Sequence, residues 1–205
     1  MSLQGEGAHM GLPTFFVRLA GCNLRCRWCD TPYARKPLRK FFTLEDILKE
    51  WERRGKLSYV QITGGEPLLQ EAAYDLMSLF LLKRVTVLLE TNGSLSLKRV
   101  PREVVKIMDL KPPSSGMEKQ MDYSNLAYLG RKDQVKFVIA DRADYVWAKE
   151  KLFKHYLPLY TQVLFSPAYG RLDPRELAEW ILKDLLPVRF QIQLHKLLWG
   201  ERPGV

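Results

Sequence analysis

Cysteine and histidine are scarce in this sequence, and their scarcity limits the kinds of site it can build. The chain has 205 residues and only three cysteines, Cys22, Cys26 and Cys29. An odd number of thiols cannot all pair as disulfides, which excludes a disulfide framework. A zinc site would need a fourth ligand from far along the chain, because the three histidines are His9, His155 and His195.

A long apolar run is also lacking. The most hydrophobic stretch, LMSLFLL at residues 76–82, ends at Lys83 and Arg84 and is too short to span a bilayer. The N-terminus shows no charged-then-apolar signal layout. We therefore expect a cytoplasmic protein with no membrane partner, in a compartment where thiols stay reduced.

Negative charge is in short supply, since 32 Lys and Arg face 23 Asp and Glu, for a formal net charge of +9. Such an excess suits a polyanionic partner. The basic residues are nevertheless spread along the chain, and most lie beside acidic ones, as in KEWERRGK and KEKLFKH. We therefore expect a solvated, salt-bridged surface and no nucleic-acid partner.

Short β-branched or aromatic runs alternate with amphipathic stretches along the chain. The runs predict strands at residues 14–19, 59–63, 84–91, 104–110, 134–140, 162–167 and 189–195. The stretches predict helices at 43–55, 67–84, 141–156 and 173–185, with Thr43 and Asp173 as N-caps. Strands alternating with helices indicate a parallel sheet. We expect an α/β fold, a partial six-stranded (β/α)-type barrel, in a single domain over residues 1–205.

A distinctive polar segment follows five of these strands. The segments are GCNLRCRWCDT after the first strand, TGGEP after the second, ETNGS after the third, DLKPPSSG after the fourth and SPAYG after the sixth. In folds of this kind the loops at the carboxyl ends of the strands carry the chemistry. The sequence therefore predicts one site at that edge of the sheet.

The three cysteines have the spacing C-x3-C-x2-C. Buried small cysteines are one interpretation, but the loop is rich in Gly, Asn and Arg rather than apolar residues. A zinc site lacks a nearby fourth ligand, and a redox Cys-x-x-Cys pair leaves Cys22 unexplained. Three thiolates can instead hold three irons of a [4Fe–4S] cluster and leave the fourth iron open to another ligand.

This spacing, with Trp28 before the last cysteine, resembles the radical S-adenosylmethionine (SAM) superfamily. The resemblance implies that SAM chelates the open iron and is cleaved to methionine and a 5′-deoxyadenosyl radical. The segment TGGEP (63–67) looks like the motif that cradles the methionyl amino group of SAM. Glycine permits close backbone approach, and we expect Glu66 to offer an acceptor to the ammonium.

Further segments resemble the 7-carboxy-7-deazaguanine synthase family of that superfamily. They are SLQGEG (2–7), WCDT (28–31), DLKPPSSG (109–116) and QLHK (193–196). The resemblance runs from residue 2 to about residue 200 and implies a substrate, 6-carboxy-5,6,7,8-tetrahydropterin. The deoxyadenosyl radical would abstract hydrogen from C6, and ring contraction with loss of ammonia would yield 7-carboxy-7-deazaguanine for queuosine, archaeosine or other 7-deazapurines. It also implies Mg²⁺, a recycled SAM, an electron donor such as flavodoxin or ferredoxin, and a homodimer.

The same resemblance implies roles for individual residues. It places the [4Fe–4S] cluster on Cys22, Cys26 and Cys29, and Mg²⁺ on Thr31. It places the substrate on Leu3, Gln4, Gly5, Arg18 and Thr63, with Arg18 on the carboxylate. It places SAM on Gly65, Glu66, Asp109, Leu110, Lys111, Ser166, Pro167, Ala168 and Tyr169, and Asn92 near SAM or the substrate.

Plainer interpretations remain open for several of these residues. Arg18 could be a strand-end surface charge, Thr31 an ordinary turn residue before Pro32, and Asn92 part of an Asn-Gly turn. Glu90 lies at the same strand end as Asn92, and we expect His195 to be a core residue rather than a catalyst.

The chain also departs from the family pattern at both ends. The family has a short strand before SLQGEG, so we expect this strand to be absent or to come from a neighbouring subunit. The tail WGERPGV runs past the usual end, where the terminal carboxylate can meet the substrate. Two rival functions remain, namely a radical SAM activase that forms a glycyl radical on a partner protein, and a non-catalytic metal-binding module.

Replacing any one of Cys22, Cys26 or Cys29 by Ala should abolish reductive SAM cleavage, because a cluster with only two protein ligands is not held. The measurement is 5′-deoxyadenosine formation after anaerobic reconstitution and reduction. Retained cleavage in any of the three variants would refute the cluster assignment.

Overall fold

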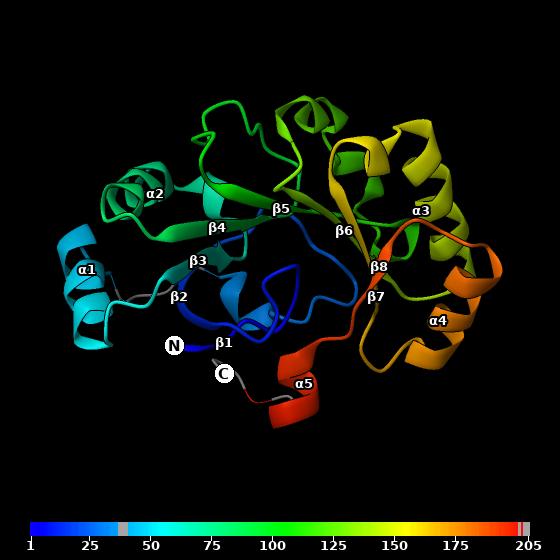
Figure 1. Ribbon diagram of the computed structural model, residues 1–205, viewed down its shortest axis with the longest axis horizontal. Helices are drawn as coiled ribbons and strands as arrows, with labels where there is room; N and C mark the ends of the chain where they lie inside the picture. Colours follow the sequence, from blue (N-terminus) through cyan, green and yellow to red (C-terminus); the bar gives the residue numbers. More distant parts are fainter. Residues whose placement is uncertain (37–40, 201, 203–205) are drawn as a thin grey trace.

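The computed structural model describes residues 1–36, 41–200 and 202. Its centre is one sheet in which eight strands neighbour one another in chain order. The strands are β1 (Ser2–Leu3), β2 (Pro13–Leu19), β3 (Tyr59–Gly64), β4 (Thr86–Thr91), β5 (Val105–Leu110), β6 (Gln134–Ile139), β7 (Gln162–Pro167) and β8 (Arg189–Phe190). Strands β2 to β8 run parallel, and β1 pairs antiparallel with β2. The predicted α/β fold with a partial barrel is confirmed, since the sheet curls into an open arc (Figure 1).

Four helices cover the outer side of this arc (Figure 1). They are α1 (Leu44–Arg53), α2 (Ala72–Leu82), α3 (Arg142–Lys154) and α4 (Pro174–Lys183). The short helix α5 (Leu194–Trp199) lies on the other side, near the N-terminal segment. The described crossings from β4 to β5 and from β5 to β6 hold no α-helix, and the latter carries the 3₁₀ turns η3 (Pro113–Ser115), η4 (Glu118–Gln120) and η5 (Tyr123–Tyr128). None of the described helices is long and apolar enough to cross a membrane.

The predicted helix starts are confirmed by their caps. The Thr43 hydroxyl accepts from the Asp46 amide at 3.1 Å, and the Thr43 amide donates back to Asp46 at 2.9 Å, which completes a capping box. The Asp173 carboxylate accepts from the Arg175 amide at 2.8 Å, with proline in the first turn. Each cap satisfies backbone donors that a helix start otherwise leaves unpaired.

Two sequence predictions were wrong in detail, and one short strand was not predicted. The strand expected at 189–195 ends at Phe190, after which Gln191 and Gln193 are buried and the chain enters α5. The helix expected at 67–84 is divided into the 3₁₀ turn η2 (Pro67–Leu69) and α2. The two-residue strand β1 lies within SLQGEG, and the sequence did not predict it because it is too brief to show an apolar pattern. Most of the tail after Gly200 lies outside the described residues.

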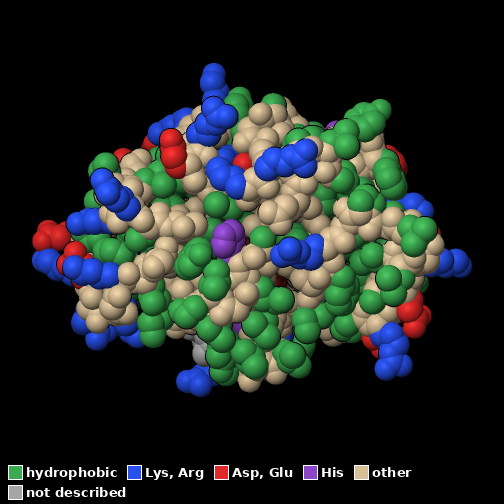
Figure 2. All heavy atoms as spheres, in the orientation of Figure 1, with side chains coloured by type: hydrophobic (Ala, Val, Ile, Leu, Met, Phe, Trp, Pro, Cys, Tyr) green, Lys and Arg blue, Asp and Glu red, His purple; other side chains and the backbone are tan. Residues whose placement is uncertain are grey.

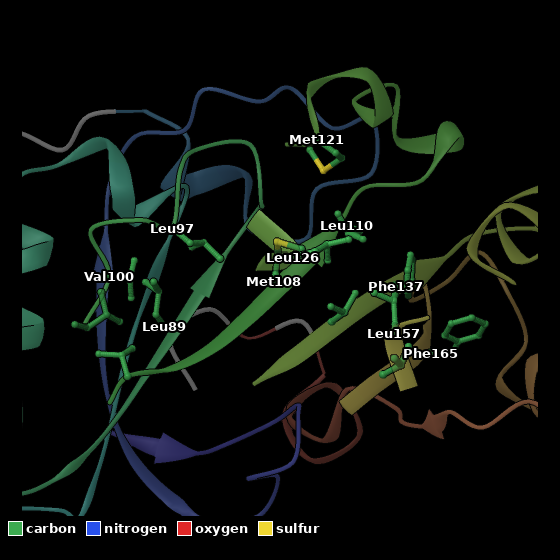
Figure 3. Packing of buried hydrophobic residues seen from close by; sticks show 14 of the residues in the cluster. Leu89, Leu97, Val100, Met108, Leu110, Met121, Leu126, Phe137, Leu157 and Phe165 are labelled. Carbon is green, nitrogen blue, oxygen red and sulfur yellow. The ribbon is translucent and has the colours of Figure 1, made fainter. Parts of the chain in front are cut away.

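The main core lies between the sheet and the outer helices. Most strand residues that face the helices are apolar, and Figure 3 shows Leu89, Met108, Phe137 and Phe165 among them. Lys106, which is buried two positions before Met108 in β5, is an exception. Phe137 contacts Phe165 and Trp147 edge-on, with ring centroids 5.4 and 5.8 Å apart. Because successive strand side chains point to opposite faces, this packing assigns the alternate residues to the inner side of the arc.

The surface carries dispersed charge. On the face in Figure 2, lysine and arginine side chains are spread among acidic and hydrophobic ones. Exposed ion pairs include Lys49 with Glu45 at 2.7 Å and Arg99 with Glu71 at 2.6 Å. These pairs agree with the salt-bridged surface that the sequence predicts, and each contributes little to stability.

Candidate active site

The inner side of the arc carries the polar residues of otherwise apolar strands. Arg18 in β2, Thr63 in β3, Glu90 in β4, Asp109 in β5 and Lys136 in β6 all line a single cavity of about 370 Å³. Arg18 is in register with Thr63, and Asp109 is in register with Lys136. Regular alternation along parallel strands therefore gathers these five side chains at one place.

The cysteine loop forms another wall of the same cavity. Cys22, Cys26 and Cys29 all line it, are partly exposed and are free thiols. The loop is held from outside, because the Arg27 amide donates to the Ser115 carbonyl at 3.0 Å and the Trp28 indole donates to the Ser114 hydroxyl at 2.9 Å. These two bonds attach the loop to the DLKPPSSG segment after β5.

The three thiols suit an iron–sulfur cluster. All three line the same cavity, and in a [4Fe–4S] cluster each thiolate binds a different iron. The Cys22 sulfur also accepts from the Leu24 amide at 3.4 Å and from the Asn92 side chain at 3.8 Å, the type of hydrogen bond that tunes a cluster.

The Cys26 thiol is expected to lose its proton when metal binds. Burial raises the pKa of this thiol, and the nearby Lys111 ammonium partly offsets that effect. Iron would displace the proton on binding, as metals do at thiol ligands. The residues present therefore suit a [4Fe–4S] cluster held by three cysteines.

The ends of β2 and β3 approach each other closely behind the cysteine loop. The Gly65 amide donates to the Leu19 carbonyl at 3.1 Å, and the Glu66 amide donates to the Gly21 carbonyl at 2.8 Å. A Cβ atom on Gly65 would lie 2.2 Å from the Gly21 oxygen, so only glycine fits there. The glycines of TGGEP are thus required by contact between two loops, and Gly65 also lines the cavity.

The Glu66 carboxylate is bound by donors of this chain. Its side chain is fully buried and does not line the cavity. Its carboxylate accepts from the Leu68 amide at 3.0 Å, the Asn92 amide at 2.7 Å and the Thr91 hydroxyl at 2.9 Å. Burial raises the pKa of Glu66, against the effect of these donors. The carboxylate therefore ties the end of β3 to the end of β4.

The cavity contains a buried network of opposite charges. The Lys136 ammonium lies 2.5 Å from Glu6, 2.5 Å from Glu90 and 3.5 Å from Asp109. The Lys111 ammonium lies 2.9 Å from the same Asp109 carboxylate. Burial disfavours the charged form of Lys111, yet Asp109 and Cys26 outweigh it and raise the pKa of this lysine. Both ammonium groups therefore stay charged inside the cavity.

A second set of hydrogen bonds joins the cysteine loop to both ends of the chain. The Gln193 amide donates to Glu6 at 2.6 Å and to Asp30 at 3.1 Å. The Thr31 hydroxyl donates to the same Asp30 at 2.9 Å. Burial alone would raise the pKa of Asp30, but Lys136, Lys111 and these two hydrogen bonds lower it. Asp30 is therefore ionised beside the cavity.

Most residues implied by the resemblance lie around this cavity. Those that line it are Leu3, Gln4, Gly5, Arg18, Cys22, Cys26, Cys29, Thr31, Thr63, Gly65, Asn92, Asp109 and Lys111. Those that do not are Glu66, Leu110, Ser166, Pro167, Ala168 and Tyr169. The Leu110 side chain packs in the core (Figure 3), so only its backbone could reach a ligand.

Two buried polar atoms near the strand ends have no partner. They are the second carboxylate oxygen of Asp109 and the hydroxyl of Ser166. Unpaired buried polar atoms are costly, and a bound ligand would satisfy them. Of the two, only Asp109 lines the cavity, and with the Gly65 backbone it gives the cavity polar contacts of the kind that SAM requires.

Sequence reasoning missed several cavity residues. Glu6, Gln61 and Lys136 were not singled out, and neither was Gln193, which does not line the cavity but bonds Glu6; each is buried or nearly so and carries a hydrogen bond to another site residue. His195 also lines the cavity, against Gly5, so the expectation of a plain core histidine was wrong. The strand segments QIT, LLET, MDL and VKF each place a polar residue among apolar neighbours. This alternation could have revealed the polar residues on the inner face of the sheet.

Comparison with known proteins agrees with this geometry. Residues 17–111 match the family model of the radical SAM superfamily. A 7-carboxy-7-deazaguanine synthase from Koribacter versatilis is 42% identical over the whole chain and 96% of its own length. One from Chlorobaculum tepidum is 42% identical over 97% of this chain and 91% of its own length. The chain belongs to the 7-carboxy-7-deazaguanine synthase family.

The fold agrees with this family membership. The crystal structure of QueE from Escherichia coli superposes with a TM-score of 0.75, covering 95% of this chain and 91% of that one at 23% identity. As a member of the 7-carboxy-7-deazaguanine synthase family, the chain is a radical SAM lyase, and the superfamily implies a [4Fe–4S] cluster and SAM. The rival interpretation as a non-catalytic metal-binding module is therefore set aside.

Replacing Glu66 by Gln should destabilise the protein by about 1–3 kcal/mol, because one amide oxygen cannot accept from three buried donors. The measurement is the free energy of unfolding of the protein without cofactor, from denaturant titration. Glu71→Gln is the matched control, since Glu71 is an exposed partner of Arg99 and its loss should change little. Equal stability of the two variants would contradict the role given to Glu66.

Proposed function

We propose that this chain converts 6-carboxy-5,6,7,8-tetrahydropterin to 7-carboxy-7-deazaguanine with loss of ammonia, within 7-deazapurine biosynthesis. The observation that carries this proposal is the composition of one cavity. It has three thiols on one wall, an arginine on a second and paired carboxylates on a third. A carboxylated pterin offers matching groups, namely a carboxylate for the arginine and N–H donors for the carboxylates.

Arg18 is the residue we assign to the substrate carboxylate. It lies near the end of β2, lines the cavity and forms no ion pair with any described carboxylate. Its guanidinium lies 5.8 Å from the centre of the Tyr33 ring, which leaves its edge free. A guanidinium edge binds a carboxylate through two parallel hydrogen bonds.

Glu6 and Glu90 are the residues we assign to the amino-pyrimidinone edge of the pterin. Both line the cavity and are ion-paired with Lys136. Ionised carboxylates only accept hydrogen bonds, and that edge presents N–H groups. The substrate would therefore be held at its two ends by groups of opposite charge.

The cofactors supply the radical chemistry, and the chain supplies binding and orientation. When bound, the cluster provides the electron that cleaves SAM to a 5′-deoxyadenosyl radical. Cys22, Cys26 and Cys29 would hold the cluster, and Gly65, Asn92, Asp109 and Lys111 would hold SAM beside it. Substrate minus ammonia equals product without net oxidation, so the hydrogen taken from C6 can return and SAM is recycled.

We also assign a Mg²⁺ ion to Thr31. Its hydroxyl lines the cavity and is bonded to the ionised Asp30. Mg²⁺ prefers oxygen ligands and keeps several waters, so one hydroxyl with a nearby carboxylate suits it. The substrate carboxylate would complete such a site.

The partners follow from the same chemistry. We propose a small acidic electron donor such as a flavodoxin or ferredoxin, because Arg25 and Arg27 are exposed on the cysteine loop.

We propose that residues 1–205 form one domain and that the enzyme is a homodimer, which light scattering would test. The larger binding surface needed by an activase of another protein has no counterpart in the cavity described here, which is of small-molecule size.

An anaerobic turnover assay tests the function directly. Reconstituted enzyme with SAM, Mg²⁺, a reductant and 6-carboxy-5,6,7,8-tetrahydropterin should form 7-carboxy-7-deazaguanine and ammonia in equal amounts. Omission of Mg²⁺ should lower the rate. A protein that cleaves SAM but forms no deazaguanine would overturn the proposed substrate.

Replacing Arg18 by Ala should raise KM for the pterin about tenfold to a hundredfold, because a charge-assisted hydrogen-bond pair is lost. The measurement is initial rate against substrate concentration, with the cluster content checked by absorbance. Arg131→Ala, which removes an exposed arginine outside the cavity, should behave as the parent. An unchanged KM in the Arg18 variant would remove this residue from the substrate site.

A further inference from the structure

Lys136 is a buried cation placed between segments that are far apart in the sequence. It lies in β6 with its side chain only 4% exposed. Its ammonium bridges Glu6 of the N-terminal segment and Glu90 at the end of β4, and it also faces Asp109 of β5. No element of the fold requires a cation here, because strands of a parallel sheet can be apolar on both faces.

The two carboxylates are also oriented by neutral donors. One oxygen of Glu6 accepts from Gln193 and the other from Lys136. One oxygen of Glu90 accepts from Lys136, and the other accepts from Gln61 at 2.8 Å and Thr63 at 3.4 Å. Each carboxylate oxygen has two acceptor positions, so both residues retain capacity for donors from a ligand.

Lys136 prevents the two carboxylates from repelling each other. Like charges brought together in a buried site raise each other's pKa, so that one of them takes up a proton. A protonated carboxyl would become a donor and could no longer receive two N–H groups from a ligand. Burial disfavours the charged lysine, yet Glu6, Glu90 and Asp109 outweigh it and raise the pKa of Lys136 well above its usual value.

Other charged groups face this cluster from the elements around it. They are Lys111 beside Asp109 in β5, Asp30 in the cysteine loop, Arg18 in β2, and His195 and Lys196 in α5. Of these cations, only Lys136 is within ion-pair distance of Glu6 or Glu90 among the described residues. Removing it would leave that pair without a direct counter-charge.

A second buried lysine offers a matched comparison. Lys106 of β5 is 3% exposed and pairs with Asp133 at 3.5 Å, but neither residue lines the cavity. Its pKa is lowered, because burial outweighs the attraction of Asp133. Lys106 therefore shares burial and an ion pair with Lys136 but lacks contact with the site.

We propose that Lys136 is a positioning residue that keeps Glu6 and Glu90 ionised and correctly spaced as the acceptor pair for the N–H edge of the substrate. This inference rests on the proposed function, because the pterin is the ligand whose donors would meet the pair. Lys136 acts through the two carboxylates, and it need not touch the substrate itself.

The test compares the pH dependence of substrate binding in Lys136→Met with that of the parent enzyme. In the variant, Glu6 and Glu90 lose their shared cation, and repulsion between two buried like charges favours uptake of a proton by one of them. KM for the pterin should then increase at least about tenfold as the pH falls from about 8.5 to about 6.5, as expected for loss of an acceptor. KM of the parent should change much less, because Lys136 remains the counter-charge of both carboxylates.

Two control variants separate this role from a structural one. Lys136→Arg keeps the cation and should restore the pH profile of the parent. Lys106→Met removes a buried ion pair elsewhere, so it should lower the unfolding midpoint without changing the pH dependence of KM. Absorbance of the reconstituted cluster should be the same in all variants.

The possible results distinguish failure of this inference from failure of the proposed function. A KM in Lys136→Met that matches the parent, or that rises by the same factor at every pH, would overturn the inference. If Lys136→Met does not fold, the charge-balanced double variant Lys136→Met with Glu90→Gln replaces it, and its KM should be raised with the flat pH profile of the parent. A parent-like KM in that double variant would also overturn the inference. Absence of deazaguanine from the parent enzyme would instead refute the proposed function itself.

Discussion

The close approach of the ends of β2 and β3 is the constraint on which the rest of the site depends. Gly65 packs against the Gly21 carbonyl so closely that no side chain fits, and two backbone hydrogen bonds fix the contact. This contact places the cysteine loop next to the TGGEP turn. Glu66, buried beneath it, then binds the backbone of Asn92 and extends the same arrangement to the end of β4. Three consecutive strand ends are thereby locked together, so the thiols and the cavity keep a fixed relation.

The charged side chains of the cavity come from alternate positions along the strands. One face of each strand packs in the apolar core, and the other presents residues such as Glu90, Asp109 and Lys136 to the cavity. Buried charges are costly unless they are paired and hydrogen-bonded. Lys136 and Lys111 form ion pairs with the carboxylates of the cavity and so offset this cost. The same carboxylates can then accept hydrogen bonds from a nitrogen-rich substrate. Binding of the substrate and stability of the inner wall therefore depend on the same groups.

The sequence predicted the local parts of this account better than the long-range ones. The C-x3-C-x2-C loop, the glycines of TGGEP and the cap at Thr43 are encoded within a few residues; the cap is confirmed, and the loop and the Gly65 turn lie together at the strand ends. Lys136 and Gln193 were missed because their partner, Glu6, lies 130 and 187 positions away. The bonds of the Glu66 carboxylate to Thr91 and Asn92 were not predicted for a related reason, since both partners lie 25 and 26 positions away. The strand expected after Arg189 failed because its buried glutamines bond the N-terminal segment instead of continuing the sheet.

The most direct test of the central claim follows one hydrogen atom. That claim is that the cavity holds a carboxylated tetrahydropterin with C6 next to the carbon radical derived from SAM. Substrate carrying deuterium at C6 should be turned over anaerobically, and 5′-deoxyadenosine and recovered SAM should be analysed by mass spectrometry. The account predicts deuterium in both molecules. Formation of deazaguanine with no deuterium in either molecule would contradict it.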